Sequence, residues 1–334
     1  MIRLHHLQAA ARFASHRLRA VHPFEVQAVL LNACNLRCVY CRCPEIKTRL
    51  MNTEQWKGTI RGLGRLGTMR IKFQGGEPTL RSDFRELCAA AGAAGMRTAA
   101  ITNGWPVAEN PALLDYLHEV VVSLDSPRAD VNDRLRGPGC HQRAVRALEL
   151  AVERGICGYV NMVLTHDTLP DLEAMLEFCE ARGLRLNAQA VGFGTEFYDD
   201  AARPLGLSAD ETRTTHRRLA EWKRQGRALM FSAAAYEKVL SWPDPGQPTA
   251  PSHGESACMA GKFYVHIQAN GDVHPCVQHN AHFTAKNILS DGLEDALRNA
   301  QRHDCGDCWI AYLNERKNVY GLRPAALLEV MRRG

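Results

Sequence analysis

Six short apolar, β-branched runs alternate with longer helix-like stretches between residues 25 and 191 of this 334-residue chain. The runs predict strands at residues 26–32, 69–74, 97–103, 120–125, 159–165 and 184–191. Helical patterns between them cover residues 83–94, 141–154 and 171–182. Nearly continuous apolar strands separated by helices are typical of a parallel sheet covered by helices. We therefore predict an α/β fold, a partial (β/α)6 TIM-like barrel, whose chemistry lies at the carboxyl ends of the strands.

The composition is that of an ordinary globular protein. Hydrophobic residues make up 46% and charged residues 23%, which excludes disordered, collagenous and coiled-coil chains. The formal net charge of +5 is too small to indicate a nucleic-acid partner by itself. No apolar run approaches the ~18 residues of a transmembrane helix. We expect a cytoplasmic protein with neither a membrane nor a nucleic acid as its partner.

Composition shifts divide the chain into four parts. Residues 1–24 form an Arg-rich, acid-free N-terminal extension, read as a surface helix or an organelle transit peptide. Residues 25–240 hold the predicted barrel and the helices after it, one of which begins at a Ser208–Glu211 capping box. Residues 241–257 form a proline-rich linker. Residues 258–334 form a small, cysteine-rich α+β domain, with an Asn-Gly hairpin over residues 263–274 and a helical tail over 324–332.

A dense cysteine motif directly follows the first predicted strand. Cys34, Cys38 and Cys41 form a C-x3-C-x2-C pattern. Three thiolates on one short loop can each bind one iron of a cubane and leave the fourth iron without a protein ligand. The alternative, a structural zinc ion, requires a fourth ligand, which Cys43 could supply.

This loop, with Tyr40 before its last cysteine, resembles that of the radical S-adenosylmethionine (radical SAM) superfamily. A Gly-Gly-Glu-Pro segment after the second strand and polar residues at the ends of later strands strengthen the resemblance. Each signal alone also fits an ordinary turn or helix cap. The resemblance implies that the SAM-binding residues are Tyr40, Gly75, Gly76, Glu77, Pro78, Thr102, Asn103, Ser123, Asp125, Arg136, Asn161 and Gln189.

A second cysteine group lies in the C-terminal part, at Cys258, Cys276, Cys305 and Cys308. Its G-x4-C element at residues 271–276 resembles the SPASM and twitch extensions of the same superfamily. No cysteine follows Cys308, so the pattern resembles the shorter twitch form, which holds one auxiliary [4Fe–4S] cluster. A four-cysteine zinc site would use the same thiolates and stays open as an alternative.

The resemblance implies two [4Fe–4S] clusters, SAM, and an electron donor such as flavodoxin or ferredoxin. In the family, the reduced first cluster cleaves SAM to a 5′-deoxyadenosyl radical, which abstracts a hydrogen atom from the substrate. Twitch-bearing relatives act on small molecules and SPASM relatives often act on peptides. Because no N-terminal peptide-binding domain is apparent, we expect a small-molecule substrate and a net oxidation or rearrangement. A peptide-modifying enzyme is the alternative, and a zinc- or iron–sulfur-binding electron carrier is a third hypothesis.

Overall fold

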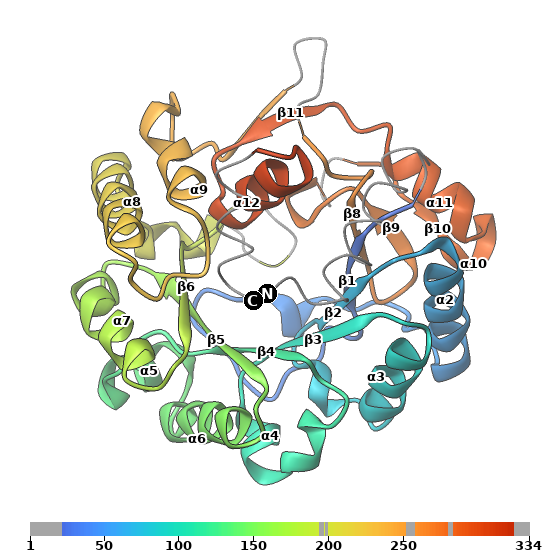
Figure 1. Cartoon of the computed structure of the whole chain (residues 1–334), viewed down its shortest axis with the longest axis horizontal. Helices are drawn as coiled ribbons and strands as arrows, with labels where there is room; N and C mark the ends of the chain where they lie inside the picture. Colours follow the sequence, from blue (N-terminus) through green and yellow to red (C-terminus); the bar gives the residue numbers. More distant parts are fainter. Residues whose placement is uncertain (1–21, 194–196, 198–199, 252–257, 280–282, 324–334) are drawn as a thin grey trace, which may run out of the picture.

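The computed structural model describes residues 22–193, 197, 200–251, 258–279 and 283–323 (Figure 1). Within these ranges one nine-stranded sheet has the strand order β10-β9-β8-β1-β2-β3-β4-β5-β6. The N-terminal extension up to residue 21, residues 252–257 of the predicted linker and the predicted tail helix lie outside the described residues.

The six predicted barrel strands are confirmed, and each pairs in parallel with the next. They are β1 (Glu25–Val29), β2 (Arg70–Gln74), β3 (Arg97–Thr102), β4 (Glu119–Ser123), β5 (Cys157–Leu164) and β6 (Arg185–Ala190). Helices on the outside of the curved sheet are α2 (Thr53–Leu66), α3 (Phe84–Ala93), α4 (Trp105–Glu109), α5 (Ala129–Arg136), α6 (Cys140–Glu153) and α7 (Leu172–Glu180) (Figure 1). The sheet runs from β10 to β6 without those two strands pairing, so the barrel is open.

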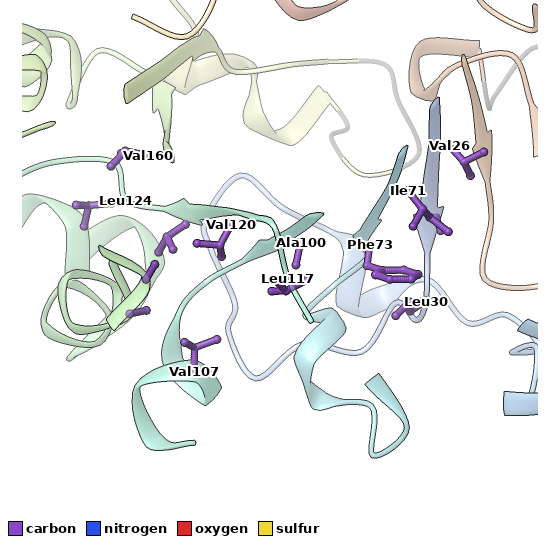
Figure 2. Close-up of a cluster of buried hydrophobic side chains, with 14 of the residues drawn as sticks. Val26, Leu30, Ile71, Phe73, Ala100, Val107, Leu117, Val120, Leu124 and Val160 are labelled. Atoms are coloured by element: carbon purple, nitrogen blue, oxygen red, sulfur yellow. The ribbon is translucent and has the colours of Figure 1, made fainter. Parts of the chain in front are cut away.

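Alternate residues of the strands face opposite sides of the barrel wall. Val26, Ile71 and Phe73 pack with Val120 and Val160 in one fully buried apolar cluster beneath the helices (Figure 2). The intervening side chains on β1 and β2 are polar and line a cavity, among them Glu25, Gln27, Arg70, Lys72 and Gln74. The expected pattern of strands apolar on both faces is therefore wrong for β1 and β2, which have an apolar outer face and a polar inner face.

The C-terminal part extends the barrel sheet. Strand β8 (Tyr264–Ile267) pairs in parallel with β1, and the predicted Asn-Gly turn connects it to the antiparallel β9 (Asp272–His274). Strand β10 (Lys286–Asn287) completes the sheet. The segment predicted as a linker contains β7 (Thr249–Pro251), which pairs with β11 (Cys305–Cys308). Pro251 ends a strand of a two-stranded sheet, where a missing N–H is tolerated.

Five further α-helices follow β6 in the described part of the chain. They are α8 (Ala209–Arg224), α9 (Ala233–Glu237), α10 (Ile288–Asp291), α11 (Leu293–Ala300) and α12 (Ala311–Tyr320). The Ser208–Glu211 capping box at the start of α8 is confirmed. Helix α12 stands between β6 and β8 in Figure 1 and reaches β1 through hydrogen bonds from Arg316 and Tyr320 to Glu25. Among the residues that the structure describes, we find no helix with the length and apolarity needed to cross a bilayer.

Candidate active site at the carboxyl end of the barrel

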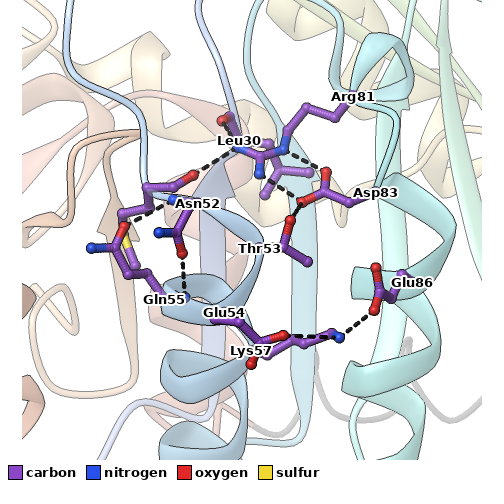
Figure 3. A network of polar contacts seen from close by, with 10 residues as sticks. Leu30, Asn52, Thr53, Glu54, Gln55, Lys57, Arg81, Asp83 and Glu86 are labelled. Carbon is purple, nitrogen blue, oxygen red and sulfur yellow. Dashed lines mark hydrogen bonds and ion pairs between the residues drawn. The ribbon is translucent and has the colours of Figure 1, made fainter.

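The cysteine loop leaves the sheet after β1 and returns before α2, and Arg81 ties both of its ends together. One guanidinium nitrogen of Arg81 donates to the carbonyl oxygens of Leu30 and Met51, at 3.1 and 3.0 Å (Figure 3). Asp83 holds the same guanidinium through two hydrogen bonds of 2.8 and 2.7 Å. Those bonds from Arg81 lower the pKa of Asp83. Arg81 therefore fixes the positions of both ends of the cysteine loop.

The three cysteines of the loop face one cavity of about 610 Å³. Backbone N–H groups two residues further along donate to two of the sulfurs, from Leu36 to Cys34 (3.4 Å) and from Cys43 to Cys41. Burial raises the pKa of all three thiols, that of Cys38 to about 12. Hydrogen bonds to sulfur stabilise the thiolate form that metal ligation requires.

Tyr40 fastens the middle of the loop to the sheet. Its hydroxyl donates a 2.5 Å hydrogen bond to Asp125, which directly follows β4. Asp125 is fully buried and also accepts two hydrogen bonds from Arg136, at 2.8 and 2.7 Å, and one from the backbone N–H of Val163. The resemblance places Arg136 among the SAM-binding residues, but the structure shows its guanidinium already paired with Asp125. Arg136 still lines the cavity, whereas Asp125 does not.

The two glycines after β2 allow two loops to touch. A Cβ atom on Gly75 would lie 2.2 Å from the carbonyl oxygen of Leu31, and one on Gly76 would lie 2.3 Å from that of Ala33. The resemblance implies that these glycines bind SAM, since a glycine lets a ligand approach the backbone closely. In the structure they let the backbone that leads to Cys34 approach, and they also line the cavity.

Glu77 is a scaffold residue inside the protein. Its fully buried carboxylate accepts hydrogen bonds from Thr102 (2.8 Å), from the backbone N–H of Asn103 (2.6 Å) and from Thr79. These bonds tie the end of β2 to the end of β3, while burial raises the pKa of Glu77. Neither Glu77 nor the buried Pro78 is part of the cavity wall.

Most of the predicted SAM-binding residues line the same cavity as the three cysteines. They are Tyr40, Gly75, Gly76, Thr102, Asn103, Ser123, Arg136, Asn161 and Gln189. The amide of Asn103 lies 3.7 Å from the sulfur of Cys34. Asn187, which the sequence analysis missed, donates to Asn161 at 2.7 Å and accepts from Gln189 at 2.9 Å. Asn187 lies two residues before Gln189 on the same strand, so the two side chains share one face, and this spacing could have indicated Asn187 from the sequence.

The second cysteine group is assembled from separate segments in a buried cluster. Cys276 and Cys308 pack with Tyr264 and Leu313, and Cys258 packs against them. A hydrogen bond from the thiol of Cys305 lowers the pKa of Cys258 to about 6. Backbone N–H groups again lie two residues along the chain, that of Ala260 donating to Cys258 and that of Ile310 to Cys308.

None of these four cysteines lines the cavity, although residues 309–312, directly after Cys308, do. The described part of the chain holds no group of three or more His, Cys, Asp or Glu side chains placed to bind a single metal ion. In both cysteine groups the thiols converge, and two sulfurs of each group accept backbone N–H donors, which fits cluster-ligating thiolates.

Comparisons with known proteins decide the family. Residues 29–179 match the model of the radical SAM superfamily, and residues 258–318 match that of an iron–sulfur cluster-binding domain, SPASM. The mycofactocin maturase MftC of Mycolicibacterium smegmatis is 33% identical over 278 residues, 79% of this chain and 67% of MftC. The chain belongs to the radical SAM superfamily. It is therefore a radical SAM enzyme, with a SPASM-type iron–sulfur domain at its C-terminal end.

Two further comparisons bear on the fold and the relatives of this radical SAM enzyme. The PqqA peptide cyclase of Ruegeria pomeroyi is 31% identical over 269 residues, 76% of this chain and 67% of the cyclase. Among solved structures, Streptococcus suis SuiB bound to precursor peptide SuiA superimposes with a TM-score of 0.64 at 19% identity, covering 94% of this chain and 77% of SuiB. This likeness confirms the predicted α/β fold.

Proposed function

We propose that this radical SAM enzyme modifies a peptide. The observation that carries the proposal is the 31% identity to a peptide cyclase over three quarters of the chain, joined to a cavity lined by the three-cysteine loop. The sequence analysis expected a small-molecule substrate and gave a peptide as the alternative. The named relatives favour the peptide alternative instead.

In this proposal Cys34, Cys38 and Cys41 hold a [4Fe–4S] cluster whose fourth iron binds SAM. The reduced cluster and SAM, when bound there, would supply a 5′-deoxyadenosyl radical for abstraction of a hydrogen atom from the substrate. The chain's own residues fix the position of the reacting groups, which determines which C–H bond is reached. Tyr40 and Asp125 hold the cysteine loop, and the remaining cavity-lining residues contact SAM and the peptide.

The second cysteine group completes the proposal. Cys258, Cys276, Cys305 and Cys308 hold one fully ligated auxiliary [4Fe–4S] cluster, the twitch arrangement. Its support is that all four thiols belong to one buried group, with backbone donors to two of them. Residues 258–334 act as the auxiliary domain and 241–257 as its connection to the barrel, and flavodoxin or ferredoxin is the proposed electron donor.

The test uses anaerobically reconstituted holoenzyme, dithionite, SAM and, as candidate substrates, synthetic peptides made from any short reading frames beside the gene. The proposal predicts that 5′-deoxyadenosine forms and that the peptide changes mass, both of which the Cys38→Ala variant loses. Cys157→Ala is the matched control, because Cys157 is exposed and does not line the cavity. Formation of 5′-deoxyadenosine with an unchanged peptide would contradict the peptide substrate, and absence of 5′-deoxyadenosine would contradict the whole reaction.

A further inference from the structure

The floor of the barrel cavity is a cluster of buried charges. Glu25 at the start of β1 is paired with Arg316 of α12 and lies 3.5 Å from Arg70 of β2. Arg70 is also paired with Glu119 at the start of β4, at 2.6 Å. The half-exposed Arg97 approaches Glu119 from outside at 4.0 Å. Both carboxylates of this charge cluster, those of Glu25 and Glu119, are thus matched by arginines.

Lys72 adds a cation that this cluster does not neutralise. It lies on β2 beside Gln27 of β1, lines the cavity and is only 6% exposed. It makes no hydrogen bond or ion pair in the described part of the chain. Glu25 and Glu119 therefore face Arg70, Arg316 and Lys72, which leaves one positive charge in excess.

Two guanidinium N–H groups of the same cluster also lack acceptors. Among the residues that the structure describes, Nε of Arg70 and Nη1 of Arg316 are buried and have no hydrogen-bond partner. A buried donor left unpaired costs about 1–3 kcal/mol, and more when the group is charged. Both arginines line the same cavity as Lys72. A bound anion would neutralise the excess positive charge beside this cavity and accept hydrogen bonds from the unpaired donors.

We propose that Lys72, with Arg70 and Arg316, binds a carboxylate of the peptide substrate inside the barrel. The carboxylate is the peptide's C-terminus or an Asp or Glu side chain, and it supplies the missing negative charge and the missing acceptors. This inference rests on the proposed peptide function and adds the chemistry of the group that the peptide presents. The site lies on β2, which ends at Gln74 directly before Gly75, and it shares one cavity with the cysteine loop.

The surroundings of Lys72 make the site sensitive to pH. Burial and repulsion from Arg70 and Arg316 lower its pKa to about 7, against the attraction of Glu25 and Glu119. Gln27 and Ala99, its neighbours across the sheet, carry no charge. A carboxylate is attracted by the protonated amine of Lys72. We therefore expect tight binding at pH values below 7 and weaker binding as the pH rises above 7.

The test measures binding of three capped dipeptides to the holoenzyme by titration calorimetry at pH 6 and pH 9. N-acetyl-dialanine carries a C-terminal carboxylate, its amide carries none, and N-acetyl-aspartyl-alanine amide carries only a side-chain carboxylate. We expect at least tenfold tighter binding of one carboxylate probe than of the amide at pH 6, and a smaller preference at pH 9. The preferred probe identifies the source of the carboxylate.

Three variants decide whether Lys72 is responsible. Lys72→Met should lose the preference at both pH values, while Lys72→Arg should retain it at pH 9 because a guanidinium stays protonated. Lys286→Met, a change of a half-exposed lysine on β10, should behave as wild type. Iron content and thermal unfolding establish that each variant is folded and loaded.

Equal binding of acid and amide by wild type would overturn the inference, as would an unchanged preference in Lys72→Met or loss of the preference at pH 9 in Lys72→Arg. The peptide function has a separate readout, the change in mass of the precursor peptide. A modified peptide without acid preference contradicts only the carboxylate site. Acid preference dependent on Lys72, with the peptide unmodified, contradicts only the proposed function.

Discussion

The two cysteine groups of this enzyme are built in opposite ways. Cys34, Cys38 and Cys41 lie within eight residues of sequence on one loop and line a cavity. The second group joins cysteines from positions 258 to 308 in a buried cluster that does not line that cavity. The first loop is held by contacts at its ends and centre, through Arg81 and Tyr40. The second is held by strand pairing and packing.

This difference indicates different tasks. A loop with three thiolates at a cavity can hold a cluster and still offer one iron to a ligand. A buried set of four thiolates encloses its cluster, as closed structural metal sites do. We therefore expect changes at the first group to stop SAM cleavage, and changes at the second to spare it.

We expect the largest effects from removing one cysteine thiolate from each group in turn. Cys38→Ala should reduce 5′-deoxyadenosine formation to below about 1% of wild type, because the cluster that cleaves SAM is lost. Cys308→Ala should retain SAM cleavage and lose the peptide product. Iron analysis should show about four irons fewer in each variant. Equal loss of SAM cleavage in the two variants would contradict the proposal that the two cysteine groups have different tasks.

The next effect comes from the anchor of the first loop. Asp125→Asn leaves the buried Arg136 without its counter-ion, which should cost about 3–5 kcal/mol of unfolding free energy in urea denaturation. Since the hydroxyl of Tyr40 loses its carboxylate acceptor in the same change, iron should fall by about one cluster, the first. Glu149→Gln, which breaks the half-exposed pair with Arg146, should cost less than about 1 kcal/mol. Equal costs would show that Asp125 does not anchor the loop.

The sequence predicted the barrel strands and the three-cysteine loop because these are local patterns, whereas the resemblance to a family supplied the second cysteine group. The sequence analysis missed the pairing of β7 with β11, since residues 249–251 and 305–308 meet only in the folded chain. It also missed the inner face of β2, although Arg70, Lys72 and Gln74 alternate with two apolar residues. The prediction treated β2 as a continuous apolar strand and so overlooked this alternation.

The predicted SAM-binding set was limited in the same way. Position at a strand end indicated Glu77 and Asp125, but only the structure shows that their carboxylates bond within the protein. Asn187 and the charged floor depend on which side chains from separate strands face one another. Motif order does not contain that information, because inward-facing neighbours are set by register between strands.

A glycine substitution gives a smaller effect on the first group. Gly76→Ala forces Cβ against two backbone carbonyl oxygens of the cysteine loop, so we expect a loss of about 2–3 kcal/mol in urea denaturation and a lower iron content. Gly92→Ala is the control, since Gly92 lies in α3 with no atom within 4 Å of the added carbon. That change should stabilise the protein by up to about 1 kcal/mol. A neutral Gly76→Ala would contradict close packing of the two loops.

The smallest effect concerns the cavity floor. Lys72 has a folded pKa of about 7, below its unfolded value of about 10.4, so the folded state binds fewer protons between those pH values. Lys72→Met should therefore be more stable than wild type by about 1 kcal/mol or more at pH 6, and this advantage should shrink as the pH rises from 7 to 10. Thermal unfolding across that range measures it. A pH-independent difference would show that Lys72 is not a buried cation.

The most direct test of the account is electron paramagnetic resonance of the Cys276→Ala/Cys308→Ala double variant, in which only the first cluster remains. The spectrum of the dithionite-reduced protein is recorded with and without SAM. We predict that SAM shifts the g-values, because it binds the iron that Cys34, Cys38 and Cys41 leave free. An unchanged spectrum at saturating SAM would contradict the claim that this loop holds an open cluster.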